Sequence, residues 1–432
     1  MSVIRRVVGG MGALAFGQAI SIGIQLISLP LFLRYWNISQ YGVWLVLSAI
    51  PSYFSMADVG MVTAAGNKMT MAMGRGDVVE ANRIFQSALV FMLIACGALA
   101  VATVPTVLLL PLFKLQDLDQ RVALCAMILG VLFSFFGGLS EAIFRATGRY
   151  GYGTTLANLT RLAELCGSII GLMTFHTFSA VALGGLAFRM LGLFALIALS
   201  ADGKYGIRWG FAGATRREVR AITRPALSFM LFPLTNALSF QGMTLLAGYE
   251  LGPVLVVIFN TYRTIARIAV QAVNIFGFSL APVFSLRFGQ AGTKGITTMY
   301  RRAAALGIVL AVSLSVVLYF SGPLLLKTWT HGRVEFYSSL MFSMLVYAAV
   351  AGAWNVPRTL LTSTNEHTQM ALWSTGISAT SLALAAGLCR VWNLQGIVLA
   401  MLLSELMLAL ICARLVKRLA SATDVGMTPH AA

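Results

Sequence analysis

The sequence predicts an all-α integral membrane protein with twelve transmembrane helices in two six-helix lobes, related by a parallel repeat around a central cavity. Composition is the first reason, because 58% of the 432 residues are hydrophobic and only 10% are charged, whereas soluble domains are about a quarter charged. The second reason is that apolar segments of about 20 residues, the length that crosses a bilayer, recur along the whole chain. The third is an uneven distribution of positive charge among the connecting segments.

We expect each apolar segment to form a helix, since the alternating ten-residue strands of membrane barrels are absent. The expected spans are 10–33, 41–63, 85–112, 121–144, 153–175, 178–200, 225–248, 253–284, 303–326, 338–357, 367–389 and 394–416. The first is too long for a cleavable signal peptide, so we expect it to stay in the mature protein. Kinks are predicted in spans one, two, seven and eight, at Pro30, Pro51, Pro233 and Pro282.

The distribution of Lys and Arg predicts that both termini are cytoplasmic. With the N-terminus inside, the cytoplasmic segments carry 21 of the 31 Lys and Arg residues, and the external loops carry six. The remaining four are Arg161, Arg189, Arg263 and Arg267, which lie within spans. This bias follows the positive-inside rule. It accounts for the net charge of +17 without nucleic acid as a partner.

The longest connection divides the predicted spans six and six. We expect an N-terminal lobe at 1–200, a basic cytoplasmic linker at 201–224, a C-terminal lobe at 225–419 and a cytoplasmic tail at 420–432. In the linker, Arg216, Arg220 and Arg224 are four residues apart, so a helix would present them on one face toward anionic membrane lipids. A solvated linker is the alternative.

Weak matches between the two halves indicate a duplication. Gly42 in SQYGVWLVL pairs with Gly252 in YELGPVLVV, and Thr147 pairs with Thr364 after the fourth and tenth spans. Because each half holds an even number of spans, the two copies have the same orientation. In transporters with such parallel repeats, the substrate site lies between the halves.

The segment FNTYRTIARIAVQAVN at 259–274 carries a polar stripe inside a predicted span. At about 100° per residue, its polar side chains fall within an arc of about 80° and extend about 21 Å along the helix. The stripe consists of Asn260, Arg263, Arg267, Gln271 and Asn274. An arginine at mid-bilayer costs roughly 2.5–3.5 kcal/mol, so this face must meet a wet cavity or buried partners. We interpret it as a substrate site for an anion, because guanidinium groups bind phosphate bidentately.

The alternative is that the stripe arginines pair with buried carboxylates. The candidates for charge pairing or for ion coupling are Asp58, Glu141, Glu164, Glu405, Arg161 and Arg189. Arg161 and Glu164 are three residues apart, which predicts a local ion pair, and Glu141 stands four residues before Arg145. Asp58 either caps a backbone break near Gly60 or carries a proton.

Nothing in the sequence indicates an enzyme or a metal site. The five cysteines lie within predicted spans without CxxC spacing, which predicts buried reduced thiols. They are Cys96, Cys125, Cys166, Cys389 and Cys412. The four histidines are scattered. We expect no cofactor, with H⁺ or Na⁺ as candidate coupling ions.

The N-terminal segment LPLFLRYWNISQYGVWLVLSAIPSYFSMADVGM at 29–61 resembles the opening of O-antigen-type polysaccharide-biosynthesis flippases. These belong to the multidrug/oligosaccharidyl-lipid/polysaccharide exporter (MOP) superfamily. The stripe segment followed by APVFS at 281–285 resembles the corresponding helix of the second lobe in such proteins. The six-plus-six layout is similar over nearly the whole chain.

This resemblance implies a MATE-like fold and a function in the bacterial inner membrane. The expected passenger is an undecaprenyl-pyrophosphate-linked oligosaccharide, moved by alternating access from the cytoplasmic to the periplasmic leaflet. The passenger's headgroup is expected in a cationic central cavity. The resemblance also implies a functional monomer and polysaccharide assembly proteins as partners.

Three rival interpretations remain at this point. A multidrug exporter of the same superfamily would need carboxylates in its cavity for cationic drugs, whereas the clearest stripe here is cationic. A membrane-embedded polymerase or ligase is expected to have a large external loop, but the longest one here has about ten residues by the predicted topology. A channel is disfavoured because no filter motif is present.

Overall fold

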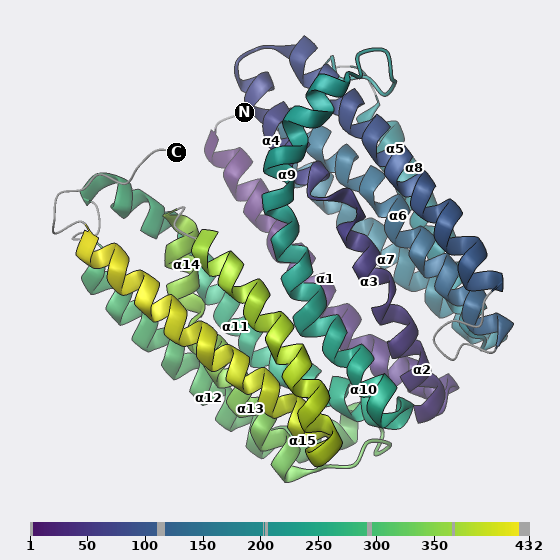
Figure 1. Cartoon of the computed structure of the whole chain (residues 1–432), viewed down its shortest axis with the longest axis vertical. Helices are drawn as coiled ribbons and strands as arrows, with labels where there is room; N and C mark the ends of the chain where they lie inside the picture. The colour runs from purple at the N-terminus through teal and green to yellow at the C-terminus, as the bar shows by residue number, and fades with distance from the viewer. Residues whose placement is uncertain are drawn as a thin grey trace. The chain divides into compact units, whose positions relative to one another are not determined.

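The computed structural model describes residues 3–109, 117–201, 203, 206–291, 296–364 and 368–422, which form helices and short loops with no strand among them (Figure 1). By its internal contacts the chain divides into two compact units, Met1–Leu234 (unit 1) and Thr235–Ala432 (unit 2). Nine of the described helices are long and apolar enough to cross a membrane, or ten if one bent pair counts as a span. The helical membrane class is therefore confirmed, and the count of twelve stays a prediction.

Unit 1 begins with a long helix and continues through a broken one into a bundle. Its elements are α1 (Val3–Tyr35), α2 (Ile38–Ala49), α3 (Pro51–Phe54), the 3₁₀ helix η1 (Ser55–Asp58), α4 (Met61–Gly74), α5 (Val78–Leu109), α6 (Leu118–Ala146), α7 (Tyr150–Phe175), α8 (Phe178–Ser200) and the first part of α9 (Arg216–Asn236). Because α7 packs against both α1 and α8, and α6 packs against α4, α5 and α8, the core of the unit lies around α6.

The second predicted span, 41–63, is broken rather than continuous. Val59 and Gly60 both adopt left-handed backbone angles, with φ of 49° and 73°. A helix cannot continue through two such residues. The chain therefore bends by 41° between the segment 38–58 and α4.

Helices α7 and α8 approach each other closely through small residues. A Cβ atom built on Gly167 would overlap the carbonyl of Gly184, and one built on Gly171 would overlap the carbonyl of Ala180. Such glycines let two membrane helices bring their backbones into contact. Cys166 is a free thiol like the other four cysteines, but it is exposed rather than buried as predicted. It is rotated about 100° from Gly167, away from this contact.

Unit 2 is a second helical bundle. Its elements are the end of α9, the π-helical segment η3 (Ala237–Gly242), α10 (Met243–Leu251), α11 (Pro253–Ala291), α12 (Thr297–Trp329), α13 (Ser338–Ala353), α14 (Asn355–Ser363) and α15 (Thr368–Ala422). The tenth predicted span is divided into α13 and α14 at Trp354. The predicted eleventh and twelfth spans lie in α15, on either side of non-helical residues Trp392 and Asn393.

The linker at 206–215 is attached to the beginning of α5 by side chains. Asn82, Gln86 and Ser87 accept hydrogen bonds of 2.8, 2.6 and 3.0 Å from backbone N–H groups of the segment 208–215. Gln86 also donates to a linker carbonyl at 3.1 Å. This part of the predicted linker is therefore held against α5 as a part of unit 1.

Helix α9 begins where the linker ends. Arg216 and Arg220 of the predicted basic face are exposed on its first turns, and the side chain of Arg224 lies outside the described residues. The lipid-facing role of these arginines remains a prediction.

Candidate functional site

Arg263 of the predicted stripe is enclosed within unit 2. Its side chain is only 1% exposed, and its guanidinium donates to the Phe240 carbonyl at 2.8 Å, to Thr244 Oγ1 at 2.6 Å and to Asn260 Oδ1. Its Cζ atom also lies 3.7 Å from the centre of the Phe240 ring and 4.7 Å from that of Phe259. All of these partners are neutral, so hydrogen bonds and aromatic faces replace the water that the guanidinium has lost.

The π-helical segment η3 explains how Phe240 becomes available to Arg263. A π-helix widens the turn relative to an α-helix, and the Phe240 carbonyl here accepts from both the Arg263 guanidinium and Thr244 Oγ1, the latter at 3.2 Å. Asn260 Oδ1 lies 3.3 Å from the same Thr244 Oγ1 and is the alternative acceptor for its single hydroxyl proton. The acceptors around Arg263 are therefore held in place by one another.

Arg267 lies one turn further along α11 and is bound differently. Its Cζ atom lies 4.5 Å from the centre of the same Phe240 ring, and its side chain is half-buried. Within the described part of the chain, its guanidinium makes no hydrogen bond and no ion pair. Arg263 thus makes three hydrogen bonds to neighbouring groups, whereas Arg267 makes none among the described residues.

Further along the stripe, Asn274 contacts polar residues of α14 that were not predicted from the sequence. Asn274 accepts a hydrogen bond from Nδ2 of Asn355 on α14, and Oδ1 of the buried Asn355 has no partner among the described atoms. Thr359 lies beside it, because a Cβ atom on Gly277 would contact both side chains. Gln271 is half-buried. The signal in the sequence was the pair Asn355 and Thr359, four residues apart at the end of the predicted span 338–357.

Glu405 of α15 belongs to a neighbouring polar cluster in unit 2. It accepts a hydrogen bond of 2.7 Å from Trp354 Nε1, and the Arg358 guanidinium lies 5.8 Å from the Trp354 ring centre. Tyr347 lies within electrostatic range of Glu405 and of both stripe arginines. Among the described residues of unit 2, no carboxylate forms an ion pair with Arg263 or Arg267. The alternative that these arginines pair with buried carboxylates is therefore not observed within this unit.

In unit 1, Glu164 pairs across helices rather than along its own. Its carboxylate accepts from Nε of Arg189 on α8 at 2.9 Å and from Nη2 of the same residue, while Arg189 Nη1 donates to the Gly130 carbonyl at 2.7 Å. The predicted pair of Arg161 with Glu164 is therefore wrong. The close approach of α7 and α8 brings Arg189 into reach, and Arg161 points to a different cavity.

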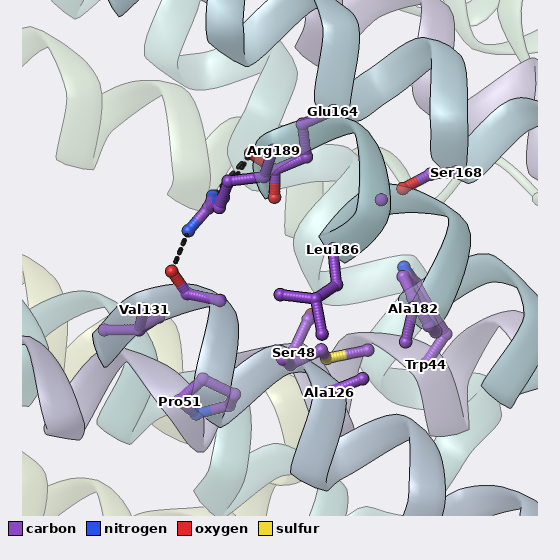
Figure 2. Close-up of a pocket in the computed structure, with 13 residues that line it drawn as sticks. Trp44, Ser48, Pro51, Ala126, Val131, Glu164, Ser168, Ala182, Leu186 and Arg189 are labelled. Atoms are coloured by element: carbon purple, nitrogen blue, oxygen red, sulfur yellow. Dashed lines mark hydrogen bonds and ion pairs between the residues drawn. The ribbon is translucent and has the colours of Figure 1, made fainter. Parts of the chain in front are cut away.

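The Glu164–Arg189 pair forms one wall of a cavity of about 210 Å³, here called the ion-pair cavity. Figure 2 shows the pair above a floor formed by Ser48, Pro51 and Ala126, with Leu186 pointing into the space. The charged groups here are already satisfied by each other and by a main-chain oxygen. This cavity therefore has little capacity left for a charged ligand.

A second cavity of unit 1, of about 350 Å³, is lined by α1, α4, α6 and α7 and is here called the polar cavity. Its lining includes Glu141, which lies within electrostatic range of Arg145 and Arg161. Neutral polar side chains from three helices complete the wall, among them Gln18, Thr63 and Thr154. Sequence reasoning treated Glu141 and Arg161 separately, and the structure brings them to one space.

Asp58 is used by the backbone. Its Oδ1 accepts a hydrogen bond of 2.9 Å from the N–H of Gly60, which is the capping alternative considered for this residue. The acid therefore stabilises the left-handed break between η1 and α4. No group of three or more His, Cys, Asp or Glu side chains suited to a metal ion occurs among the described residues.

Comparisons with known proteins identify the fold. The chain matches no family profile and no curated protein sequence. It is similar to a solved multidrug resistance MATE family transporter of the MOP superfamily in its inward-facing conformation, with a TM-score of 0.75 and 12% identity over 94% of this chain and 99% of the other. An outward-facing conformation of such a transporter matches with a TM-score of 0.66 and 13% identity over 97% of each chain.

A MOP superfamily transporter from Pyrococcus furiosus is similar as well. Its binding pocket is described as having reverse polarity that suggests a different function, and it matches with a TM-score of 0.63 and 14% identity over 96% of this chain and 94% of the other. At these identities the likeness shows the fold alone. The chain has a MATE-like fold.

Proposed function

We propose that this chain is an alternating-access transporter that exports a phosphate-bearing amphiphile, an undecaprenyl-pyrophosphate-linked oligosaccharide, across the bacterial inner membrane. The fold supports transport, because a solved neighbour with this fold is described in inward- and outward-facing conformations. The predicted topology, with both termini cytoplasmic, supports a cytoplasmic loading side. Coupling to H⁺ or Na⁺ and an interaction of the basic linker with anionic lipids belong to the same proposal.

The observation that carries the proposal is the difference between Arg267 and Arg263. Arg263 is enclosed and donates three hydrogen bonds to neutral groups, while Arg267 shares only the Phe240 ring. A guanidinium in a membrane helix without a carboxylate is costly, and such residues mark substrate pathways. Its free donors suit a phosphate oxygen pair, which an ammonium group would bind with less geometric definition.

Vesicle transport with Arg267 variants tests this proposal. The full chain is reconstituted in proteoliposomes with a fluorescent undecaprenyl-pyrophosphate trisaccharide, and its appearance in the opposite leaflet is measured. We expect Arg267→Gln to slow transport at least tenfold and Arg267→Lys to restore part of the rate. Arg301→Gln, which removes the same charge from an exposed position on α12, should transport normally. Wild-type rates for Arg267→Gln would exclude the proposed role of this arginine.

A multidrug exporter is the second candidate, because the solved neighbours are described as multidrug resistance transporters. A cationic drug requires an available acid. Asp58 accepts from the Gly60 N–H, Glu164 is paired and Glu405 is hydrogen-bonded to Trp354, which leaves Glu141 on the polar cavity of unit 1 as the candidate. The same vesicles tested with ethidium distinguish the two. Transport of ethidium without transport of the glycolipid would replace the anion proposal with drug export.

A further inference from the structure

The polar cavity of unit 1 has side chains whose hydrogen-bonding capacity is unused. Six polar residues of its lining make no side-chain hydrogen bond with any other described residue. They are Gln18, Thr63, Glu141, Arg145, Thr154 and Arg161. In the ion-pair cavity of the same unit, by contrast, Glu164 and Arg189 bond to each other and to Gly130. Gln18 and Arg161 are exposed and the other four are half-buried, so all six can bind water or a polar ligand.

The fold leaves room for these side chains by placing glycines behind them. A side chain at Gly66 would collide with the Arg145 guanidinium, and a Cβ atom on Gly17 would lie 2.7 Å from Asn158 Nδ2. Asn158 donates to the Ala13 carbonyl at 3.2 Å, so its position is fixed by α1. The two glycines therefore leave room for the side chains of Arg145 and Asn158 at the cavity wall.

The spacing of polar residues on α7 also indicates a continuous wall. Tyr150, Thr154, Asn158 and Arg161 follow one another at intervals of four, four and three residues and all line the cavity. Residues at this spacing share one helix face. This stripe is shorter than the one on α11, 150–161 against 260–274, and it carries one arginine rather than two.

The mixture of groups defines the chemistry of a ligand. An anion would meet the Glu141 carboxylate, and a cation would meet the guanidinium groups of Arg145 and Arg161. A neutral ligand that both donates and accepts hydrogen bonds can use all three, together with the amide and hydroxyl groups of Gln18 and Thr154. Polyhydroxylated rings have this property, and a volume of about 350 Å³ lies within the range of small-molecule sites.

We infer that the polar cavity of unit 1 is a carbohydrate subsite that binds an uncharged sugar ring of the passenger. The inference rests on the proposed transport of a glycan-bearing lipid, and it deepens that proposal by assigning sugar recognition to unit 1. Glu141 accepts from ring hydroxyls while Arg145 and Arg161 donate to them. The phosphate is recognised elsewhere, at Arg267.

Binding of free sugars to the detergent-solubilised full chain tests the subsite without requiring transport. Saturation-transfer NMR is recorded with a panel of neutral disaccharides and trisaccharides, and separately with inorganic pyrophosphate. We expect sugar signals with the wild type. The double variant Gln18→Leu/Thr154→Val, which removes two hydrogen-bonding groups with little change of shape, should weaken the best sugar about tenfold.

A filling variant and a matched control remove the dependence on any single contact. Thr154→Trp should abolish sugar binding by occupying the cavity. Leu159→Trp places the same ring on an exposed part of α7, where Leu159 is 46% exposed, and should bind sugar like the wild type. Thermal melting of each variant verifies that it is folded.

The outcomes separate this inference from the proposed function. Sugar binding that persists in Arg267→Gln but is lost in Thr154→Trp supports the subsite. Equal sugar binding in the wild type and Thr154→Trp, or no sugar binding by the wild type, overturns it, while glycolipid transport that depends on Arg267 would still support the proposed function. Pyrophosphate binding that is lost in an Arg161→Gln variant would replace the sugar subsite with an anion site.

Discussion

The two units stabilise an arginine of a predicted span in opposite ways. In unit 1, Arg189 is neutralised by the carboxylate of Glu164 on the next helix. In unit 2, Arg263 has no acid and relies on a carbonyl, a hydroxyl, an amide oxygen and two aromatic rings. Unit 1 thereby cancels a charge inside the membrane, while unit 2 keeps one. The difference teaches that a buried arginine in this fold can be hydrogen-bonded by neutral groups alone. The site around it then stays positively charged.

Removing an acceptor from Arg263 should have the largest effect on stability. Asn260→Leu leaves the buried guanidinium short of one partner, and we expect the free energy of unfolding to fall by about 3 kcal/mol, because the unsatisfied group is charged. Melting temperatures of the solubilised protein measure this. The double variant Asn260→Leu/Arg263→Met should recover most of the loss, since the charge is gone. If the double variant were as unstable as Asn260→Leu alone, stabilisation of Arg263 by these neutral groups would be contradicted.

Breaking the ion pair of unit 1 should have a smaller effect. Glu164→Leu leaves Arg189 with the Gly130 carbonyl alone, and we expect a loss of about 2 kcal/mol, because both side chains retain some exposure, 33% for Glu164 and 22% for Arg189. A double-mutant cycle with Arg189→Leu should give a coupling energy of about 1–3 kcal/mol. Additive losses would show that the two side chains do not stabilise each other.

Substitutions of Asp58 test whether this acid acts through its hydrogen bond or through its charge. Asp58→Ala removes the acceptor for the Gly60 N–H, and the expected loss is about 1 kcal/mol, the usual net contribution of one hydrogen bond. Asp58→Asn keeps an acceptor, and its free energy of unfolding should lie within a few tenths of a kcal/mol of that of the wild type. If both variants lost the same stability, the negative charge rather than the hydrogen bond would be what matters.

The smallest effect is expected at the exposed pair of Glu250 with Arg390 in unit 2. The hydrogen bond from Arg390 lowers the pKa of Glu250 below its ordinary value. Its stabilising contribution is therefore present above the ordinary pKa of a glutamate and disappears as the pH falls through the lowered one. Glu250→Gln should remove this pH dependence, and 0.5 M salt should weaken it in the wild type. A pH effect unchanged by the substitution would assign it to another group.

The sequence predicted the helical membrane class because apolar length and charge asymmetry are local properties. It offered a break near Gly60 as one of two roles for Asp58 but still predicted a continuous span at 41–63, which the structure divides. It did not predict that Glu164 pairs with Arg189, because which helices touch depends on the glycine contacts between α7 and α8. Arg263 and Arg267 looked equivalent by spacing, and they differ because Phe240, Thr244 and Asn260 accept hydrogen bonds from Arg263 alone.

The polar cavity was missed for a different reason. Its charged residues were considered in pairs along single helices, while the neutral members Gln18, Thr63 and Thr154 come from three helices. The regular spacing of Tyr150, Thr154, Asn158 and Arg161 was visible in the sequence. It lacked the repeated arginines that made the stripe on α11 conspicuous.

The backbone contact of α7 with α8 has an evolutionary consequence. Where Gly167 meets Gly184, any side chain would overlap a carbonyl, so these positions have one permitted residue. Neighbouring lipid-facing positions accept almost any apolar side chain. Among homologues that have diverged widely in sequence, we therefore expect substitution to be arrested at this pair while it continues on both sides. We therefore expect the packing of α7 against α8 to be retained among homologues, while the sequence of the rest of unit 1 varies.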